Sequence, residues 1–181
     1  MVIAYHVIFT TYGTWLPNDP RGSYSKDVYI GQLRSLGNVR YGRQNPQPAK
    51  ETLQEFWAVA RQNTNRPPFF INDRTRPLVA SGFQAVINRF NITVPACAIM
   101  NDHVHILIMR SRYRIEYLVN QLKGAATKAM KLKCSPWTRS FWKTFINDTD
   151  TLSAAAAYIR ANPENSGLSP QSWDFVTPLS V

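Results

Sequence analysis

The spacing of apolar residues changes several times along the chain and predicts a mixture of strands and helices. Short apolar runs or a two-residue alternation, both typical of strands, occur at 3–11, 92–100, 103–110 and 140–146. Apolar residues recur at helical spacing, and predict helices, at 49–64, 72–90, 114–132 and 150–162. The last helix should stop at Pro163, because proline lacks the N–H that a helix interior needs.

Two stretches lack such periodicity. Residues 12–23 are rich in Gly, Pro, Asn and Asp, which favour turns. Residues 24–48 are polar and basic, and we expect an extended loop or arm there. The order strand, helices, two strands, helix, strand, helix suits an α+β domain with a mostly antiparallel sheet and helices packed on one face.

The charge of the chain points to a polyanionic partner. Its 21 Lys and Arg against 11 Asp and Glu give a formal charge of +10, which in a domain of this size favours nucleic acid or an anionic membrane. A membrane is disfavoured, since no apolar run approaches the roughly 20 residues of a spanning helix. The N-terminal segment lacks the basic start of a signal peptide. We therefore expect a cytoplasmic protein that binds nucleic acid.

The two cysteines do not change this picture. Cys97 and Cys134 are too few and too far apart for a disulfide framework or a CxxC metal site. We expect two reduced thiols.

The stretch "NDHVHILI" at 101–108 places two histidines one position apart in a predicted strand. Side chains alternate along a strand, so His103 and His105 share one face, with Cα atoms roughly 7 Å apart. Val104 and Ile106 point to the other face and into the core. The two imidazoles could converge on one metal ion. A histidine pair with no metal role is the alternative, since two ligands do not complete a site.

The last predicted helix carries a tyrosine after a run of alanines, in "TLSAAAAYIRANPENSGL". Small residues before Tyr158 would let the helix lie close to a sheet and leave the phenol clear. Asn162 follows at i+4 on the same helical face, and its amide oxygen suits Mg²⁺ or Mn²⁺. We expect Pro163 to push Asn162 away from the helical conformation. A core tyrosine followed by a capping asparagine is the alternative reading.

Taken together, these motifs resemble those of the single-tyrosine HUH transposases. "NDHVHILI" is similar to the His–hydrophobic–His motif, and "YIRANPENSGL" is similar to the family's tyrosine segment. The nearest resemblance is to the REP-associated tyrosine transposases, over about 1–20 and 69–170. Residues 24–68 have no counterpart. The resemblance therefore implies a single domain, 1–181, with an insertion or arm at about 24–68.

The resemblance also implies a fold and an activity. The fold would be ferredoxin-like α+β, with a mostly antiparallel sheet, the histidine strand central in it and the catalytic tyrosine on a C-terminal helix. The activity would be metal-dependent cleavage and rejoining of single-stranded DNA, often beside a hairpin. By position, His103, His105 and Asn162 would bind Mg²⁺ or Mn²⁺, and Tyr158 would be the nucleophile that joins the 5′ phosphate. We assign no general base.

Basic and aromatic residues supply candidate DNA contacts. Cations and stacking rings together suit single-stranded DNA, and such residues are frequent in the arm, which also holds Tyr24, Tyr29 and Arg34. Solvated lysines without a ligand are the alternative for the third helix. The candidate contacts are Trp15, Arg21, Arg40, Arg43, Lys123, Lys128 and Lys131.

Three other functions remain open at this point. One is a non-catalytic protein that binds DNA hairpins and derives from a transposase. Another is a phosphoesterase with two histidine motifs, although His6, the remaining histidine, supplies no second motif. The third is a basic structural protein whose histidines bind zinc incidentally. Either a monomer or a homodimer is compatible with the sequence.

Overall fold

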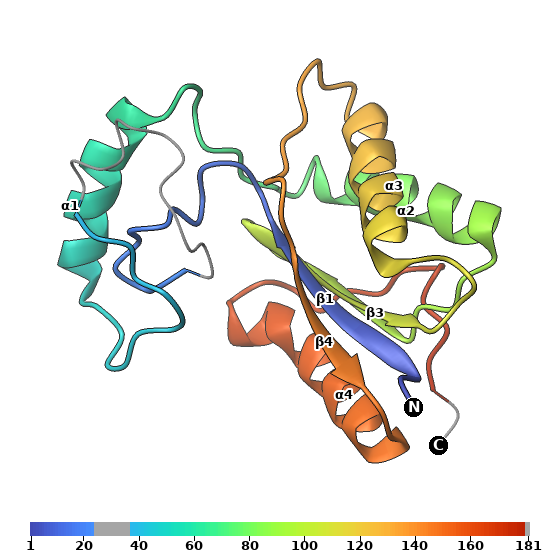
Figure 1. The fold of residues 1–181 in the computed structure, drawn as a ribbon. Coiled ribbons are helices and arrows are strands. Elements are labelled where there is room, and N and C mark those ends of the chain that lie inside the picture. Colours follow the sequence, from blue (N-terminus) through green and yellow to red (C-terminus); the bar gives the residue numbers. More distant parts are fainter. Residues whose placement is uncertain (24–36, 180–181) are drawn as a thin grey trace. The chain divides into compact units, whose positions relative to one another are not determined.

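The computed structural model describes residues 1–23 and 37–179 (Figure 1). They divide into two compact units, one made of Met1–Thr10 and Ile71–Val181 and the other of Thr11–Phe70. Part of the expected arm, 24–36 with Tyr24, Tyr29 and Arg34, lies outside the described residues. No described helix is long and apolar enough to cross a membrane.

The first unit is built around a four-stranded antiparallel sheet, as far as the described residues show. Its strands are β1 (Ala4–Thr10), β2 (Ala96–Ile99), β3 (His103–Met109) and β4 (Trp142–Ile146). Their order across the sheet is β2-β3-β1-β4, and every neighbouring pair is antiparallel. The predicted α+β fold is confirmed, and the histidine strand β3 lies in the interior of the sheet.

Helices cover both faces of this sheet, as Figure 1 shows. They are α2 (Arg76–Phe90), α3 (Ile115–Ala129) and α4 (Thr149–Asn165). On one face the ring of Phe9 packs edge-on against Phe83 of α2. On the other face Leu107 joins a buried cluster with Ala156 and Ile159 of α4. The expectation of helices on one face was wrong, because the middle of the sheet is apolar on both sides and each side must be covered.

The helix α4 extends past its expected end. Pro163 lies inside it rather than after it, so Asn162 keeps a helical environment and the expectation that it would leave the helix was wrong. The proline sits in the last turn, where its missing N–H removes a single backbone bond. Gly167, at φ +73°, donates its N–H to the Glu164 carbonyl, and Leu168 donates to the Pro163 carbonyl. This Schellman arrangement closes the helix end.

The second unit contains the helix α1 (Lys50–Ala60) and the short 3₁₀ helix η2 (Arg61–Asn63). These lie within the helix predicted at 49–64. Leu16 and Ala60 are buried together, with Phe56 and Trp57 packed partly against them. Burial of these side chains gives the unit a small apolar core of its own.

Candidate active site

The face of the sheet covered by α4 carries the two histidines of β3. Pairing of β1 with β3 sets Ile8 opposite His105 and His6 opposite Leu107, so His6 is on that face too. His105 is buried, at 5% exposure. The structure thus adds His6 to the predicted pair. The alternation of side chains along β1 shows which residues share a face with His6. Only the pairing of β1 with β3 shows that His105 lies on the same face of the sheet.

Each histidine of the pair has one ring nitrogen engaged by a neighbour. Nδ1 of His105 lies 3.0 Å from Nε2 of His6. Nδ1 of His103 lies 2.6 Å from Oδ1 of Asp102. The rings of His103 and His105 are 4.8 Å apart between centroids. In both residues Nε2 is the nitrogen left for a ligand, and a carboxylate behind a histidine is a common way to orient a metal-binding imidazole.

Burial keeps the inner imidazoles neutral. Burial, together with the nearby charges of His103 and His6, lowers the pKa of His105 to about 3. Burial also lowers the pKa of His6. A histidine must be neutral to bind a metal, so at neutral pH His105 is already in the form that binds one.

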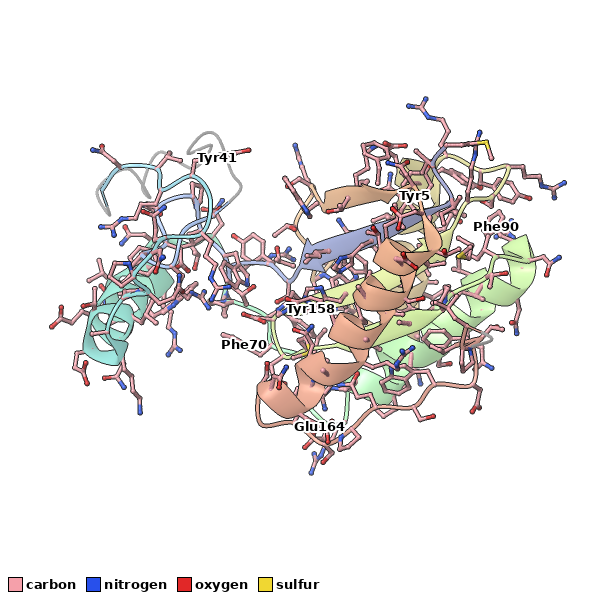
Figure 2. The ribbon with its side chains drawn as sticks, turned by 90° about the horizontal axis from the view of Figure 1, so that it is seen from below. Tyr5, Tyr41, Phe70, Phe90, Tyr158 and Glu164 are labelled. Carbon is pink, nitrogen blue, oxygen red and sulfur yellow. The ribbon has the colours of Figure 1, made fainter. Side chains whose placement is uncertain are left out.

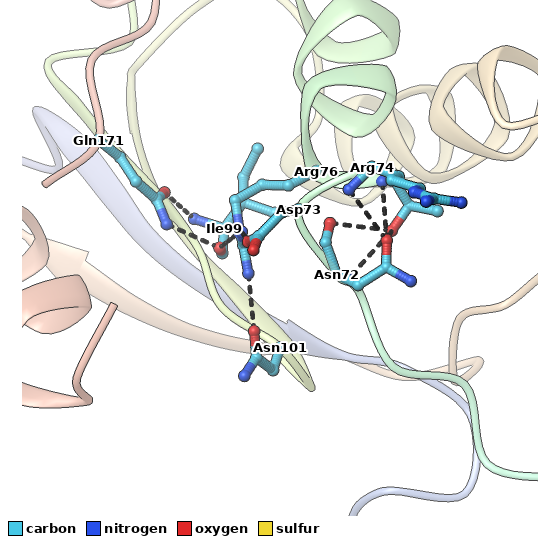
Figure 3. Close-up of polar contacts among 8 residues, drawn as sticks. Asn72, Asp73, Arg74, Arg76, Ile99, Asn101 and Gln171 are labelled. Carbon is cyan, nitrogen blue, oxygen red and sulfur yellow. Dashed lines mark hydrogen bonds and ion pairs between the residues drawn. The ribbon is translucent and has the colours of Figure 1, made fainter. Parts of the chain in front are cut away.

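The turn that presents Asp102 and His103 is braced by buried polar contacts (Figure 3). The guanidinium of Arg76 donates to the Ile99 carbonyl at 2.9 Å and to Oδ1 of Asn101 at 2.7 Å. The side-chain amide of Gln171 pairs with both backbone groups of Ile99, as another strand would. These bonds hold the end of β2 and the start of β3 in a defined geometry.

Tyr158 stands on α4 beside the histidines, and Figure 2 shows its ring projecting from that helix. Its ring centroid is 5.7 Å from that of His105 and 6.1 Å from that of His6. It is 54% exposed, whereas Ala156 and Ile159 on the same helix are buried in the cluster against the sheet. Small side chains let the helix approach the strands, and a substrate can still reach the phenol.

Asn162 follows Tyr158 by one turn, and its Nδ2 donates to the Tyr158 backbone carbonyl at 2.8 Å. That bond leaves Oδ1 as the group that could take a metal. In the part of the chain that is described, no three His, Cys, Asp or Glu side chains are grouped to hold a metal ion. A metal at His103 and His105 therefore needs an oxygen from another kind of group. The amide oxygen suits Mn²⁺ or Mg²⁺, whereas imidazole nitrogens suit transition metals, so this set of ligands fits Mn²⁺ better than Mg²⁺.

The predicted DNA contacts fall in both units. Arg40 and Arg43 are exposed in the second unit, and Lys128 and Lys131 are exposed at the end of α3.

Two further candidates, Trp15 and Arg21, contact each other. Arg21 forms an ion pair with Asp19 at 2.8 Å, and its guanidinium lies 3.9 Å from the centroid of the Trp15 ring.

Lys123 is not available to DNA, and its prediction as a contact was wrong. Its side chain is buried, and its ammonium donates to the carbonyls of Thr138, Arg139 and Ser140 at 3.0, 3.3 and 3.0 Å. The helical spacing already indicated that this side chain could be buried. Lys123 lies at i+4 from Val119, on the buried stripe of α3.

Comparison with known protein families matches residues 52–162 to the model of the IS200-like transposases. Comparison with curated proteins gives no match.

Among solved structures, the chain is similar to a REP-associated tyrosine transposase bound to a REP hairpin. The identity is 14% and the TM-score 0.50, over 96% of this chain and 74% of that one. A protein of Deinococcus radiodurans R1, provisionally assigned as a transposase, matches at 14% identity and a TM-score of 0.40, over 93% of this chain and 94% of that one. At 14% identity, the likeness to the REP-associated transposase concerns the fold alone.

Proposed function

The chain belongs to the IS200-like transposase family, and from that premise we propose that it cleaves and rejoins single-stranded DNA through a metal-dependent 5′-phosphotyrosine step. The observation that carries this proposal is the position of Tyr158 on α4, within ring contact of His105 and His6. The proposed nucleophile Tyr158 thus lies over the face of the sheet that carries the proposed metal ligands His103 and His105.

The proposed reaction is a transfer of one phosphodiester. The phenol oxygen of Tyr158 attacks the phosphorus and loses its proton, a bond forms to the 5′ phosphate, and the bond to the 3′ oxygen breaks. That oxygen takes up a proton and leaves as a 3′-OH. The new bond retains the energy of the phosphodiester, so a 3′-OH can reverse the step and rejoin the strands.

A divalent metal would supply neutralisation of the phosphate charge and polarisation of its oxygens when bound. His103 and His105 would hold it through Nε2, with Asn162 as the third ligand. Asp102 and His6 would act behind these ligands, because each engages the opposite ring nitrogen of one histidine. They are positioning residues, since neither would touch the DNA or the metal.

We further propose that the DNA contains a hairpin and that the chain is nearest in function to the REP-associated branch. The support is the fold likeness to a transposase that is described as bound to a REP hairpin. The formal charge of +10 suits a DNA partner. Exposed Arg40, Arg43, Lys128 and Lys131 would contact phosphates.

The decisive experiment uses a labelled single-stranded oligonucleotide that folds into a hairpin, with Mg²⁺ or Mn²⁺. We expect a covalent protein–DNA adduct and a product with a free 3′-OH, both absent in Tyr158→Phe. Tyr5→Phe, which alters a tyrosine on the face of β1 away from His6, is the matched control and should form the adduct. Adduct formation by Tyr158→Phe would overturn the assignment of the nucleophile.

A second variant separates catalysis from binding. His103→Ala should abolish metal-dependent cleavage while DNA affinity changes little, because phosphate contacts dominate that affinity. Tight hairpin binding by the wild type without any adduct, across both metals, would instead support the non-catalytic DNA-binding alternative.

A further inference from the structure

A basic and aromatic pocket lies at the end of β3 opposite the histidines. It has a volume of about 400 Å³, and its lining includes Phe90, Ile92, Met109, Arg110, Arg112 and Tyr113. His103 begins β3 and Met109 ends it, which separates the pocket from the candidate active site by roughly 20 Å at the rise of a strand. None of these residues belongs to the catalytic proposal.

Aromatic rings form one wall. Phe90 makes edge-on contacts with Tyr113 and Tyr117, with centroids 5.0 and 5.6 Å apart. Tyr117 is 44% exposed. Perpendicular rings of this kind leave faces on which a flat ligand can stack, and nucleobases stack on such faces whatever their sequence.

Cations surround these rings. Arg110 and Arg112 are exposed. Nη2 of Arg112 donates to the Tyr113 hydroxyl at 2.7 Å, and its guanidinium lies 4.9 Å from the centroid of that ring. Arg89 lies over Phe90 at 5.2 Å. Contacts with Tyr113 thus orient the Arg112 guanidinium in the absence of a ligand. This lowers the entropic cost of binding a phosphate.

A carboxylate close to the pocket in the sequence, Glu116, has cationic partners of its own. Glu116, in the first turn of α3, is bonded to Lys143 of β4 and lies 3.8 Å from Arg114. The same turn starts α3, and the side chain of its N-cap Arg114 makes no capping bond. Helix N-termini favour anions, so the start of α3 adds to the electrostatic attraction of the arginines for a phosphate.

We propose that this pocket binds one unpaired nucleotide of the DNA, with its base against Phe90 and Tyr113 and its phosphate on Arg110 and Arg112. The volume falls in the range of small-molecule sites, about 300–1,000 Å³, and the charge matches a phosphate. The identity of the ligand as DNA rests on the proposed function. The spacing of roughly 20 Å corresponds to about six base-pair steps, so a short stem can lie between the pocket and Tyr158.

The site can be mapped directly by photo-crosslinking. Tyr158→Phe protein, which cannot form the covalent adduct, is mixed with a hairpin oligonucleotide carrying 5-iododeoxyuridine at unpaired positions, irradiated and digested. We expect crosslinked peptides that contain Tyr113 or Tyr117. Crosslinks confined to α4 and to residues 37–70 would overturn the proposal.

Binding measurements give an independent test in the same background. Arg110→Ala with Arg112→Ala should weaken hairpin binding by about tenfold. It should also flatten the slope of log K against log salt by about 0.7–0.9, the contribution of the one phosphate that the two arginines share. Lys50→Ala with Arg61→Ala removes two exposed charges elsewhere and controls for net charge. Equal effects of the two double variants would contradict a specific site.

This result is separable from the catalytic proposal. Binding and crosslinking need neither Tyr158 nor a metal, so failure of adduct formation in the wild type would leave the pocket result standing. Conversely, loss of crosslinks at the pocket would leave the phosphotyrosine step untouched.

Discussion

The buried ammonium of Lys123 organises the segment that leads into β4. Its three carbonyl partners are consecutive, Thr138, Arg139 and Ser140, and the indole N–H of Trp137 donates back to the Lys123 carbonyl at 2.9 Å. Burial lowers the pKa of Lys123 to about 8. A charged group is tolerated there because several carbonyls replace its water.

Replacing this lysine tests its structural role. Lys123→Met should reduce the free energy of unfolding by about 1–3 kcal/mol, because buried carbonyls lose their donor. Lys128→Met, on the exposed side of the same helix, should change it by less than about 0.5 kcal/mol. Urea denaturation followed by circular dichroism measures both. Equal stabilities of the two variants would show that the carbonyls find other partners.

His6 gives a second prediction at this scale. Its bond to Nδ1 of His105 fixes that ring, and loss of such a partner typically weakens metal binding by about 10–100-fold. We expect His6→Ala to show this loss for Mn²⁺ in isothermal titration calorimetry, without any DNA. Tyr5→Phe, one position away and on the opposite face of β1, is the control. If His6→Ala bound Mn²⁺ as tightly as the wild type, His6 would not be needed to position His105.

At the scale of elements, α2 and α3 touch through a glycine. A Cβ at Gly82 would lie 2.6 Å from the backbone nitrogen of Ala126 and 2.7 Å from its Cα. The backbone atoms of Ala126 cannot move aside to relieve this overlap as the end of a flexible side chain could. The close approach of these helices over the sheet therefore depends on the missing side chain.

The corresponding substitution has a matched control in the chain. Gly82→Ala should destabilise the fold by about 1–3 kcal/mol through overpacking. Gly124→Ala, where a Cβ meets open space on α3, should stabilise it by about 0.5–1 kcal/mol because alanine favours a helix. Thermal unfolding distinguishes them by the sign of the shift. Stabilisation by both substitutions would mean that the helices can separate at little cost.

The ion pair between α3 and β4 predicts a pH dependence. The hydrogen bond from Lys143 holds the pKa of Glu116 below its ordinary value of 4.5, so folding favours the ionised carboxylate. Its contribution to stability is present above pH 4.5 and is lost as the pH falls through the lowered pKa. Because water screens this exposed pair, we expect less than about 1 kcal/mol.

The comparison of wild type with Glu116→Gln checks this sign. The variant should be slightly less stable near pH 7, and the stabilities of the two proteins should converge as the pH falls below 4.5 and through the lowered pKa of Glu116. A difference that persists or grows in acid would contradict the linkage.

At the scale of the whole molecule, the second unit, Thr11–Phe70, falls in the sequence between two parts of the first. Thr10 ends β1 opposite His103, and the N–H of Ile71 donates to the Asn101 carbonyl at 2.7 Å. The two points are thus close together at one end of the sheet. Such a geometry lets an insertion be removed without stretching the host fold.

We expect a variant in which about six Gly and Ser residues replace Thr11–Phe70 to fold, since a linker of that length spans up to about 20 Å. It should unfold cooperatively and bind Mn²⁺ as the full chain does, because every proposed ligand lies outside the deleted part. Circular dichroism and calorimetry measure these properties. A variant that stays unfolded would show that the first unit does not fold without the second.

The sequence was sufficient to predict the strands, the helices and the main catalytic candidates, because these depend on local periodicity and on motifs. The two-residue period put His103 and His105 on one face, and the spacing on α4 put Tyr158 and Asn162 one turn apart. The resemblance then gave these residues their proposed roles. The charge of the chain was enough to favour nucleic acid as a partner, and the resemblance narrowed this expectation to DNA.

Only the tertiary structure decided which distant residues meet. The strand register brought His6 to His105, and the packing of α4 brought Tyr158 to both, because pairing and docking join segments that no local pattern connects. Lys123 turned inward for the same reason, since its partners come from another part of the chain. Local periodicity tells which face of an element a side chain occupies, but the fold alone determines what lies against that face.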